Sequence, residues 1–159
     1  GLIKKEKLLI NREFFQKLNN LNYAYGFVSG AEKESAEFIL KDKLKLVDLN
    51  LVSMNDAPGK PDPTGLITMI NKLKKKNLKT RNRLIFYIGD TVSDTLTVIN
   101  ARKELIEENI VSIGVIPPHL QKVDQNDHKE KYSNILLKAG SEIIIESLYE
   151  LFEAIKVYS

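Results

Sequence analysis

The stretch RLIFYIGDTVSD, residues 83–94, decides the fold of this chain. Its apolar and aromatic run over 84–88 predicts a strand buried on both faces, as in parallel sheets. Gly89 allows a sharp turn after the strand. Asp90 then stands at the carboxyl end of the strand, where open α/β sheets bind their ligands, and Asp94 falls in the first turn of the helix that we expect next.

Two carboxylates at the end of a strand suit a hard divalent cation such as Mg²⁺, which prefers oxygen ligands. An ordinary strand-to-helix loop is the alternative, and it accounts well for Asp94, because acidic side chains are favoured in the first turn of a helix. It accounts less well for Asp90, because a carboxylate against an apolar strand end is costly to desolvate without a partner. The pattern G-D-x-x-x-D is weak alone, so its partners must come from the rest of the chain.

Composition narrows the class of protein. The chain has 159 residues, the length of one domain, with 43% hydrophobic and 28% charged residues, as in ordinary globular proteins. It contains no cysteine, which excludes disulfides, zinc–thiolate sites and a catalytic thiol. No apolar run is long enough to cross a bilayer, and the first residues do not form a signal-peptide pattern. We therefore expect a cytoplasmic protein that does not bind membranes.

The densest basic stretch is KLKKKNLKTRNR, residues 72–83, in a chain of net charge +3. Such a run could contact nucleic acid. No aromatic side chain interleaves its charges, and cations are favoured at the carboxyl end of a helix. We interpret it as the solvated end of a helix and a loop, and expect no nucleic-acid partner.

Strand and helix patterns alternate along the chain. The sequence predicts helices over 11–20, 32–40, 63–73, 93–107, 135–139 and 148–155, strands over 23–28, 46–54, 83–88, 110–116 and 143–145, and a polar loop over 121–131. Strands that alternate with helices at this spacing form βαβ units with right-handed crossovers. The expected fold class is therefore α/β, a Rossmann-like three-layer α/β/α arrangement around a parallel sheet.

Two further strand ends carry candidate site residues. Ser29 and Gly30 follow the first strand, and a hydroxyl with a backbone N–H at a helix start can bind a phosphate-sized anion; a plain N-cap is the alternative. Lys60 lies in the loop APGKPDPT, residues 57–64, whose prolines stiffen the backbone. A lysine held this way is well placed for a phosphoryl group or a carboxylate, although most single lysines are surface residues.

Together these patterns resemble the haloacid dehalogenase superfamily of phosphohydrolases, subfamily I. Residues 28–30 match the second motif of the family, a strand that ends in Ser or Thr. Residues 59–63, GKPDP, match the third motif, the lysine loop, and residues 89–94 match the fourth, the acidic metal motif. The resemblance covers the chain from about residue 9 onward, and the three motifs are fairly specific only in combination.

The first motif of the family, D-x-D-x-T/V, does not occur in this sequence. In the family it lies on strand 1, the middle of a sheet ordered 3-2-1-4-5, and supplies the nucleophilic aspartate. The resemblance therefore predicts a core that lacks its central first strand, with residues 1–9 as the end of a cap or linker and residues 10–159 as the core. It also predicts that an N-terminal segment, or a second copy in a homo-oligomer, fills the sheet.

The resemblance implies a Mg²⁺-dependent phosphatase that acts on a small phosphorylated metabolite, with this chain an inactive C-terminal portion on its own. Ser29 and Gly30 would hold the phosphoryl group together with Lys60, which would also offset its charge. Asp90 would bind Mg²⁺, and Asp94 would bind it or orient its ligands, so Lys60, Asp90 and Asp94 form the expected catalytic set. The alternative is a non-catalytic interaction or regulatory module of the same fold.

Overall fold

The computed structural model describes residues 12–43, 50–76 and 84–158. The described helices are α2 (Arg12–Asn20), α3 (Lys33–Glu37), the π-helix Phe38–Lys43, α4 (Thr64–Lys76), α5 (Val92–Glu104), α6 (Asn126–Ala139) and α7 (Leu151–Ala154). Short 3₁₀ turns occupy Pro118–Leu120, Val123–Gln125, Leu148–Glu150 and Ile155–Tyr158. None of these helices has both the length and the apolar content needed to span a membrane.

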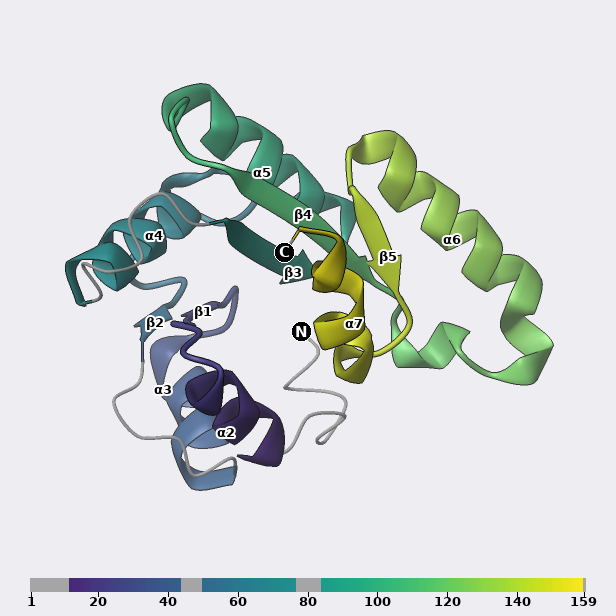
Figure 1. Ribbon diagram of the computed structural model, residues 1–159, viewed down its shortest axis with the longest axis horizontal. Helices are drawn as coiled ribbons and strands as arrows, with labels where there is room; N and C mark the ends of the chain where they lie inside the picture. Colours follow the sequence, from purple (N-terminus) through teal and green to yellow (C-terminus); the bar gives the residue numbers. More distant parts are fainter. Residues whose placement is uncertain (1–11, 44–49, 77–83, 159) are drawn as a thin grey trace.

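The strands form two parallel sheets (Figure 1). One contains β1 (Phe27–Val28) and β2 (Leu51–Val52), and the other has the order β3-β4-β5, with β3 at Ile85–Gly89, β4 at Ile110–Val115 and β5 at Ile143–Ile145. Every residue of β4 is buried, because this strand has a neighbour on each side and helices over both faces. The predicted α/β fold with parallel strands is confirmed.

The two sheets are separated between β1 and β3. Within the described residues, β1 pairs with β2 and β3 pairs with β4, but β1 and β3 are not hydrogen-bonded neighbours. The segment Ile143–Ile145 pairs with the other side of β4 and does not lie between β1 and β3. Within the described residues the strands therefore form the orders β1-β2 and β3-β4-β5, with β5 at the outer edge of the second sheet.

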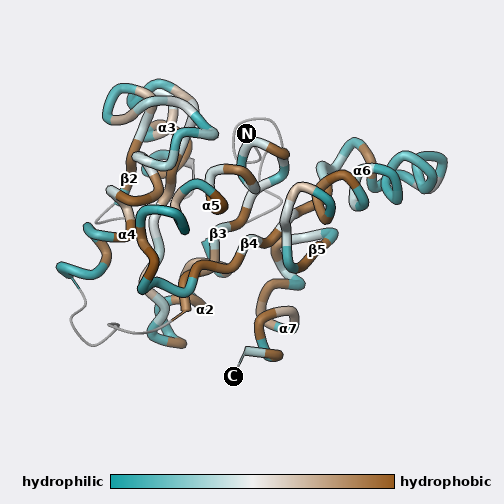
Figure 2. The backbone as a smooth tube through the Cα atoms, turned by 90° about the horizontal axis from the view of Figure 1, so that it is seen from above, coloured by the Kyte–Doolittle hydropathy of each residue, from teal (hydrophilic) through white to brown (hydrophobic). Residues whose placement is uncertain are grey.

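Two hydrophobic clusters cover the opposite faces of the sheets. Helices α4 and α5 supply Leu66, Ile70, Val98 and Ala101, which pack with Tyr87 of β3. On the other face, side chains of α2 and α7 pack together with apolar side chains of β4 and β5; the buried members are Phe14, Phe15, Leu18, Leu40, Val111, Ile113, Val115, Ile145, Leu151 and Ile155. Helices therefore lie on both sides of the strands, in three layers. In Figure 2, β4 stands out as a continuous hydrophobic segment within these layers.

Helix α4 joins the two sheets. At its start, a Cβ on Gly65 would lie 3.1 Å from Val28 Cγ1 and 3.6 Å from Val52 Cγ1, so the helix backbone passes close to the ends of β1 and β2. Leu66, the next residue, and Ile70, about one turn after it, pack in the same cluster as Tyr87 of β3. Apolar contacts of α4 thus hold β1 and β2 in place relative to β3.

Several predicted boundaries are wrong by a few residues. The strand expected over 23–28 is shortened to Phe27–Val28. In the described part of the stretch 46–54 the strand is Leu51–Val52, because among the described residues of the two stretches only these form ladder pairs. The helix expected over 93–107 ends at Glu104, where Leu105 leaves the helical region with φ −107° and ψ 67°. The linker predicted over 1–9, the cap at residue 11 and the residues 44–49 and 77–83 lie outside the described part of the chain.

The predicted polar loop over 121–131 is wrong. A 3₁₀ turn leads into α6, which begins at Asn126 and runs for 14 residues, far longer than the predicted 135–139. The helix buries one residue, Leu136, so its first half carries no apolar periodicity for a sequence pattern to detect. Helix α6 ends at Gly140, whose φ of 124° suits glycine.

Substitution of Leu136 tests how α6 is anchored. Leu136 is 0% exposed and would contact any side chain added at Gly114 of β4. We expect Leu136→Ala to lower the free energy of unfolding by about 2–5 kcal/mol, measured by urea denaturation, since it leaves a cavity between α6 and the sheet.

The neighbouring Leu137 is the matched control, because its side chain is 46% exposed on the same helix. Leu137→Ala should change the free energy of unfolding by less than about 0.5 kcal/mol. Equal losses in the two variants would contradict the packing of α6 described above.

Candidate functional site

Asp94 is fixed at the start of α5 by a capping box. Its Oδ2 accepts hydrogen bonds from the Thr91 backbone N–H at 3.1 Å and from Thr91 Oγ1 at 2.8 Å, while the Asp94 N–H donates to Thr91 Oγ1 at 3.2 Å. The carboxylate lies against the last residue of β3: a Cβ on Gly89 would come within 2.3 Å of Asp94 Cγ. Glycine is therefore required at position 89 to let Asp94 fold back over the strand end.

Lys60 forms an ion pair with this same carboxylate. Its Nζ lies 2.6 Å from Asp94 Oδ1, and the two side chains are 27% and 8% exposed respectively. The Tyr87 hydroxyl donates to Asp94 Oδ1 at 3.3 Å, and Lys60 Nζ lies 5.6 Å from the centre of the Tyr87 ring. Strand β3, helix α5 and the lysine loop thus meet at one buried carboxylate.

Burial and charge act in opposite directions on these groups. Burial alone would lower the pKa of Lys60, but its interactions with Tyr87 and Asp94 outweigh burial and raise the pKa, so the ammonium group stays charged. Burial raises the pKa of Tyr87 to about 12. The Lys60 charge opposes this rise and the Asp94 charge adds to it, so the phenol is neutral at physiological pH.

The lysine loop is held by hydrogen bonds of the two residues that follow Lys60. The carbonyl of Pro61, which follows a cis peptide bond, accepts a hydrogen bond from Asn100 Nδ2 of α5 at 3.0 Å. Asp62 Oδ1 accepts from the Thr64 N–H at 2.9 Å and so satisfies a backbone donor at the start of α4. The position of Lys60 thus depends on both helices that flank the loop.

Asp90 differs from Asp94 in having no such partners. None of the ion pairs of the described residues includes Asp90. Its side chain is partly buried, and burial is the largest influence on its pKa. Burial, and next the neighbouring charge of Asp94, raise the pKa of Asp90. Its backbone carbonyl accepts a hydrogen bond from the Tyr132 hydroxyl of α6. The backbone of Asp90 is therefore held by α6, while its carboxylate forms none of the ion pairs of the described residues and can accept a cation.

Ser29 and Gly30 lie at the end of β1. The Ser29 N–H continues the ladder by donating to the Val52 carbonyl at 2.8 Å, and Ser29 Oγ accepts from the Ala31 N–H at 3.0 Å. Gly30 is exposed, and a Cβ there would meet no atom within 4 Å. No hydrogen bond or ion pair of the described residues joins Ser29 or Gly30 to Lys60 or Asp90.

The structure thus brings Lys60, Asp90 and Asp94 together at the end of β3, with Ser29 and Gly30 at the end of a neighbouring sheet. Within the described residues no group of three or more acidic or histidine side chains could hold a metal ion. Asp94 Oδ2 and Oδ1 are already engaged by Thr91, Lys60 and Tyr87. A cation that needs only one protein carboxylate, as Mg²⁺ often does, fits Asp90 best.

Sequence reasoning missed the residues that support this site. Tyr87 was counted only as part of an apolar strand, and nothing in its neighbourhood signals that its hydroxyl meets Asp94. Tyr132 fell between the predicted loop over 121–131 and the predicted helix over 135–139, and no role was assigned to it. The spacing of Thr91 and Asp94, in contrast, is a capping-box pattern that the sequence displays.

Comparisons with known proteins add a likeness in fold. No protein-family model matches the chain, and no curated protein matches it. One solved crystal structure superposes with a TM-score of 0.63 over 89% of this chain and 73% of the other, at 14% sequence identity. A likeness at this identity supports the α/β fold and carries no information on function.

Replacement of Asp90 by asparagine tests its electrostatic environment. The pKa of Asp90 is higher in the folded than in the unfolded protein. Its contribution to stability is therefore fully present below about pH 3.9, the ordinary pKa of aspartate. The contribution is lost as the pH rises through the folded pKa. Asp90→Asn should therefore be more stable than the wild type at pH 7 in metal-free buffer. Thermal or urea unfolding measures the difference, which should shrink as the pH falls toward 4.

Asp124→Asn is the control, since Asp124 is exposed and lies on the 3₁₀ turn before α6. It removes the same charge and should leave the stability difference between pH 7 and pH 4 unchanged. If Asp90→Asn is destabilised at pH 7 instead, the carboxylate has a stabilising partner that the site described above lacks.

Proposed function

We propose that this chain provides the phosphate-binding and metal-binding parts of a haloacid dehalogenase-type phosphohydrolase that acts on a small phosphorylated metabolite. The observation that carries the proposal is the joint placement of Lys60, Asp90 and Asp94. A charged, partly buried lysine lies at the carboxyl end of a parallel strand beside a carboxylate that forms no ion pair within the described residues. Electrostatic sites of this kind stabilise phosphoryl groups.

Each residue has a defined part in the proposal. The Lys60 ammonium group offsets negative charge on the phosphoryl oxygens, and its ion pair with Asp94 holds it at the strand end. The Ser29 hydroxyl and the Gly30 N–H donate to phosphoryl oxygens. Asp90 is the carboxylate that would hold Mg²⁺, and the negative charge of Asp94 acts on both Lys60 and Asp90. When bound, the Mg²⁺ ion would neutralise charge on the phosphoryl oxygens.

Catalysis of this type needs an aspartate nucleophile, which forms an aspartyl-phosphate that water then hydrolyses. The family motif that supplies this aspartate is absent from the 159 residues. The nearest spacing is that of Asp124 and Asp127, three residues apart. They lie on a 3₁₀ turn and on the first turn of α6, not on a strand. The proposed activity therefore requires an aspartate from outside this sequence.

The second candidate function follows from the same absence. Without a nucleophile, the described site can bind a phosphorylated ligand but cannot accept its phosphoryl group. A non-catalytic regulatory module of the same fold would keep the anion site, with no need for a cation at Asp90. Metal binding therefore separates the two candidates.

We expect Mg²⁺ to stabilise the chain against thermal unfolding. A ligand at ten times its dissociation constant adds about 1.4 kcal/mol to the free energy of unfolding. The shift in melting temperature should be absent in Asp90→Asn and retained in Asp124→Asn, whose carboxylate lies away from the site. A wild-type protein that gives no shift up to millimolar Mg²⁺ would favour the non-catalytic module.

We also expect negligible hydrolysis of an aryl phosphate such as p-nitrophenyl phosphate by this chain alone, even with Mg²⁺ present, because no nucleophile motif is present. Release of p-nitrophenol is the measurement. When the chain is supplied with the missing motif, Lys60→Ala and Asp90→Asn should each lower kcat by about 10²–10³, the effect of removing one oxyanion-type interaction.

Asp124→Asn should leave that kcat unchanged. Turnover by the isolated chain that depends on Asp90 would show that the nucleophile lies within these residues.

A further inference from the structure

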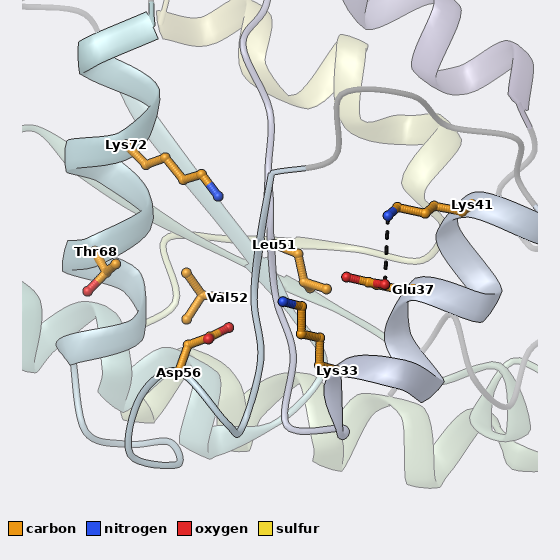
Figure 3. A pocket seen from close by; sticks show the side chains of 8 residues that line it. All are labelled: Lys33, Glu37, Lys41, Leu51, Val52, Asp56, Thr68 and Lys72. Carbon is orange, nitrogen blue, oxygen red and sulfur yellow. Dashed lines mark ion pairs between the residues drawn. The ribbon is translucent and has the colours of Figure 1, made fainter.

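A pocket of about 540 Å³ lies on the outer side of β2, away from the site at β3 (Figure 3). Its walls are α3 with the π-helix on one side and α4 on the other, and its floor is Leu51 and Val52. The lining residues are Lys33, Glu37, Lys41, Leu51, Val52, Asp56, Thr68 and Lys72. None of them belongs to the candidate site. The volume is in the range of pockets that bind small molecules.

The acidic side chains of the pocket already have partners. Glu37 pairs with Lys41, one turn later on the same wall, at 3.7 Å. Asp56 Oδ2 accepts from the Ser53 N–H at 3.0 Å and from Ser53 Oγ at 3.1 Å. These hydrogen bonds lower the pKa of Asp56, with smaller contributions from two of the lysines, so it stays ionised.

Two lysines of the pocket form no ion pair with its carboxylates. Lys33 and Lys72 take part in none of the ion pairs of the described residues, although both lie near enough to Asp56 to affect it electrostatically. Figure 3 shows their ammonium groups extending into the pocket from opposite walls, Lys33 from α3 and Lys72 from α4. Three lysines against two carboxylates give the lining a net positive charge.

The floor of the pocket combines apolar side chains with the edge of β2 that pairs with no strand of the described residues. The carbonyls of Asn50 and Val52 accept from the N–H groups of Phe27 and Ser29, both at 2.8 Å, so these residues turn toward β1. In a parallel ladder the residue between them faces the other way, and the backbone N–H of Leu51 therefore points toward the pocket side.

We propose that this pocket binds a small organic anion. Its phosphate, phosphonate or carboxylate head lies between the ammonium groups of Lys33 and Lys72, and its apolar body rests on Leu51 and Val52. Thr68 supplies a hydroxyl at the α4 wall. Lysines at phosphate sites act as point charges with several donors, which suits two ammonium groups that approach one head group from opposite sides. The proposal does not depend on the proposed function.

The test is a titration of the ¹⁵N-labelled chain with phenylphosphonate, a dianion with an apolar ring and no bond that a phosphatase can hydrolyse. We expect saturable amide shifts at Lys33, Leu51 and Lys72, with inorganic phosphate binding at least several-fold more weakly because it lacks the ring. The double variant Lys33→Gln/Lys72→Gln should weaken phenylphosphonate binding at least about tenfold, the scale of one lost charge-assisted hydrogen bond.

Lys103→Gln/Lys138→Gln is the matched control. It removes the same two charges at exposed positions in the last turns of α5 and α6, outside the pocket, and should change the dissociation constant by less than about twofold. All four lysines lie outside the hydrophobic clusters, so both variants should keep the wild-type spectrum elsewhere. Equal weakening in both variants, no saturable shifts, or shifts confined to Asp90 and Thr91 would each overturn the proposal. Equal binding of inorganic phosphate would overturn the part played by the apolar floor.

Discussion

The carboxylate of Asp94 is the group on which the rest of the site depends. It caps α5 through Thr91, pairs with Lys60 and accepts the Tyr87 hydroxyl, while it lies almost wholly out of solvent. A buried ion pair is favourable only when further hydrogen bonds satisfy the remaining oxygens, and here Thr91 and Tyr87 do so. Gly89 completes the arrangement, because any larger residue would occupy the space of the carboxylate.

This interaction also ties the two sheets together. Lys60 belongs to the loop between β2 and α4, whereas Asp94 belongs to the helix after β3, so their ion pair crosses from one sheet to the other. Asn100 adds a hydrogen bond to the same loop, and α4 adds apolar contacts to both sheets. Hydrogen bonds between β1 and β3 are not needed to position the lysine loop over the end of β3.

Two carboxylates four residues apart have different physical roles. Asp94 has its oxygens engaged and serves to hold Lys60, whereas Asp90 is partly desolvated and lies beside a like charge with no cation paired to it. A carboxylate in that position is favourable only if something positive arrives. The pocket beside β2 shows the opposite imbalance: its lining carries three lysines against two carboxylates, and two of these lysines form no ion pair within the described residues. The chain therefore presents unmatched charges of opposite sign at separate places.

Sequence alone determined the alternation of strands and helices, the parallel sheet, the placement of Ser29 and Asp90 at strand ends and that of Lys60 in a loop between a strand and a helix. These features follow from local rules: apolar runs predict buried strands, and turn residues mark where strands end. The same rules failed for α6, because a helix that buries only Leu136 has no apolar period to display.

Tertiary structure decided what no local pattern contains. Three contacts of the site join residues 7 to 42 positions apart in the sequence. Lys60 pairs with Asp94, the Tyr87 hydroxyl donates to the same carboxylate, and the Tyr132 hydroxyl donates to the Asp90 carbonyl. The lysine pocket likewise exists only because α3 and α4 stand on either side of β2. Sequence patterns report the preferences of neighbouring residues, whereas these contacts depend on how the helices pack over the sheets. That packing decided that Asp94, and not Asp90, forms the ion pair with Lys60.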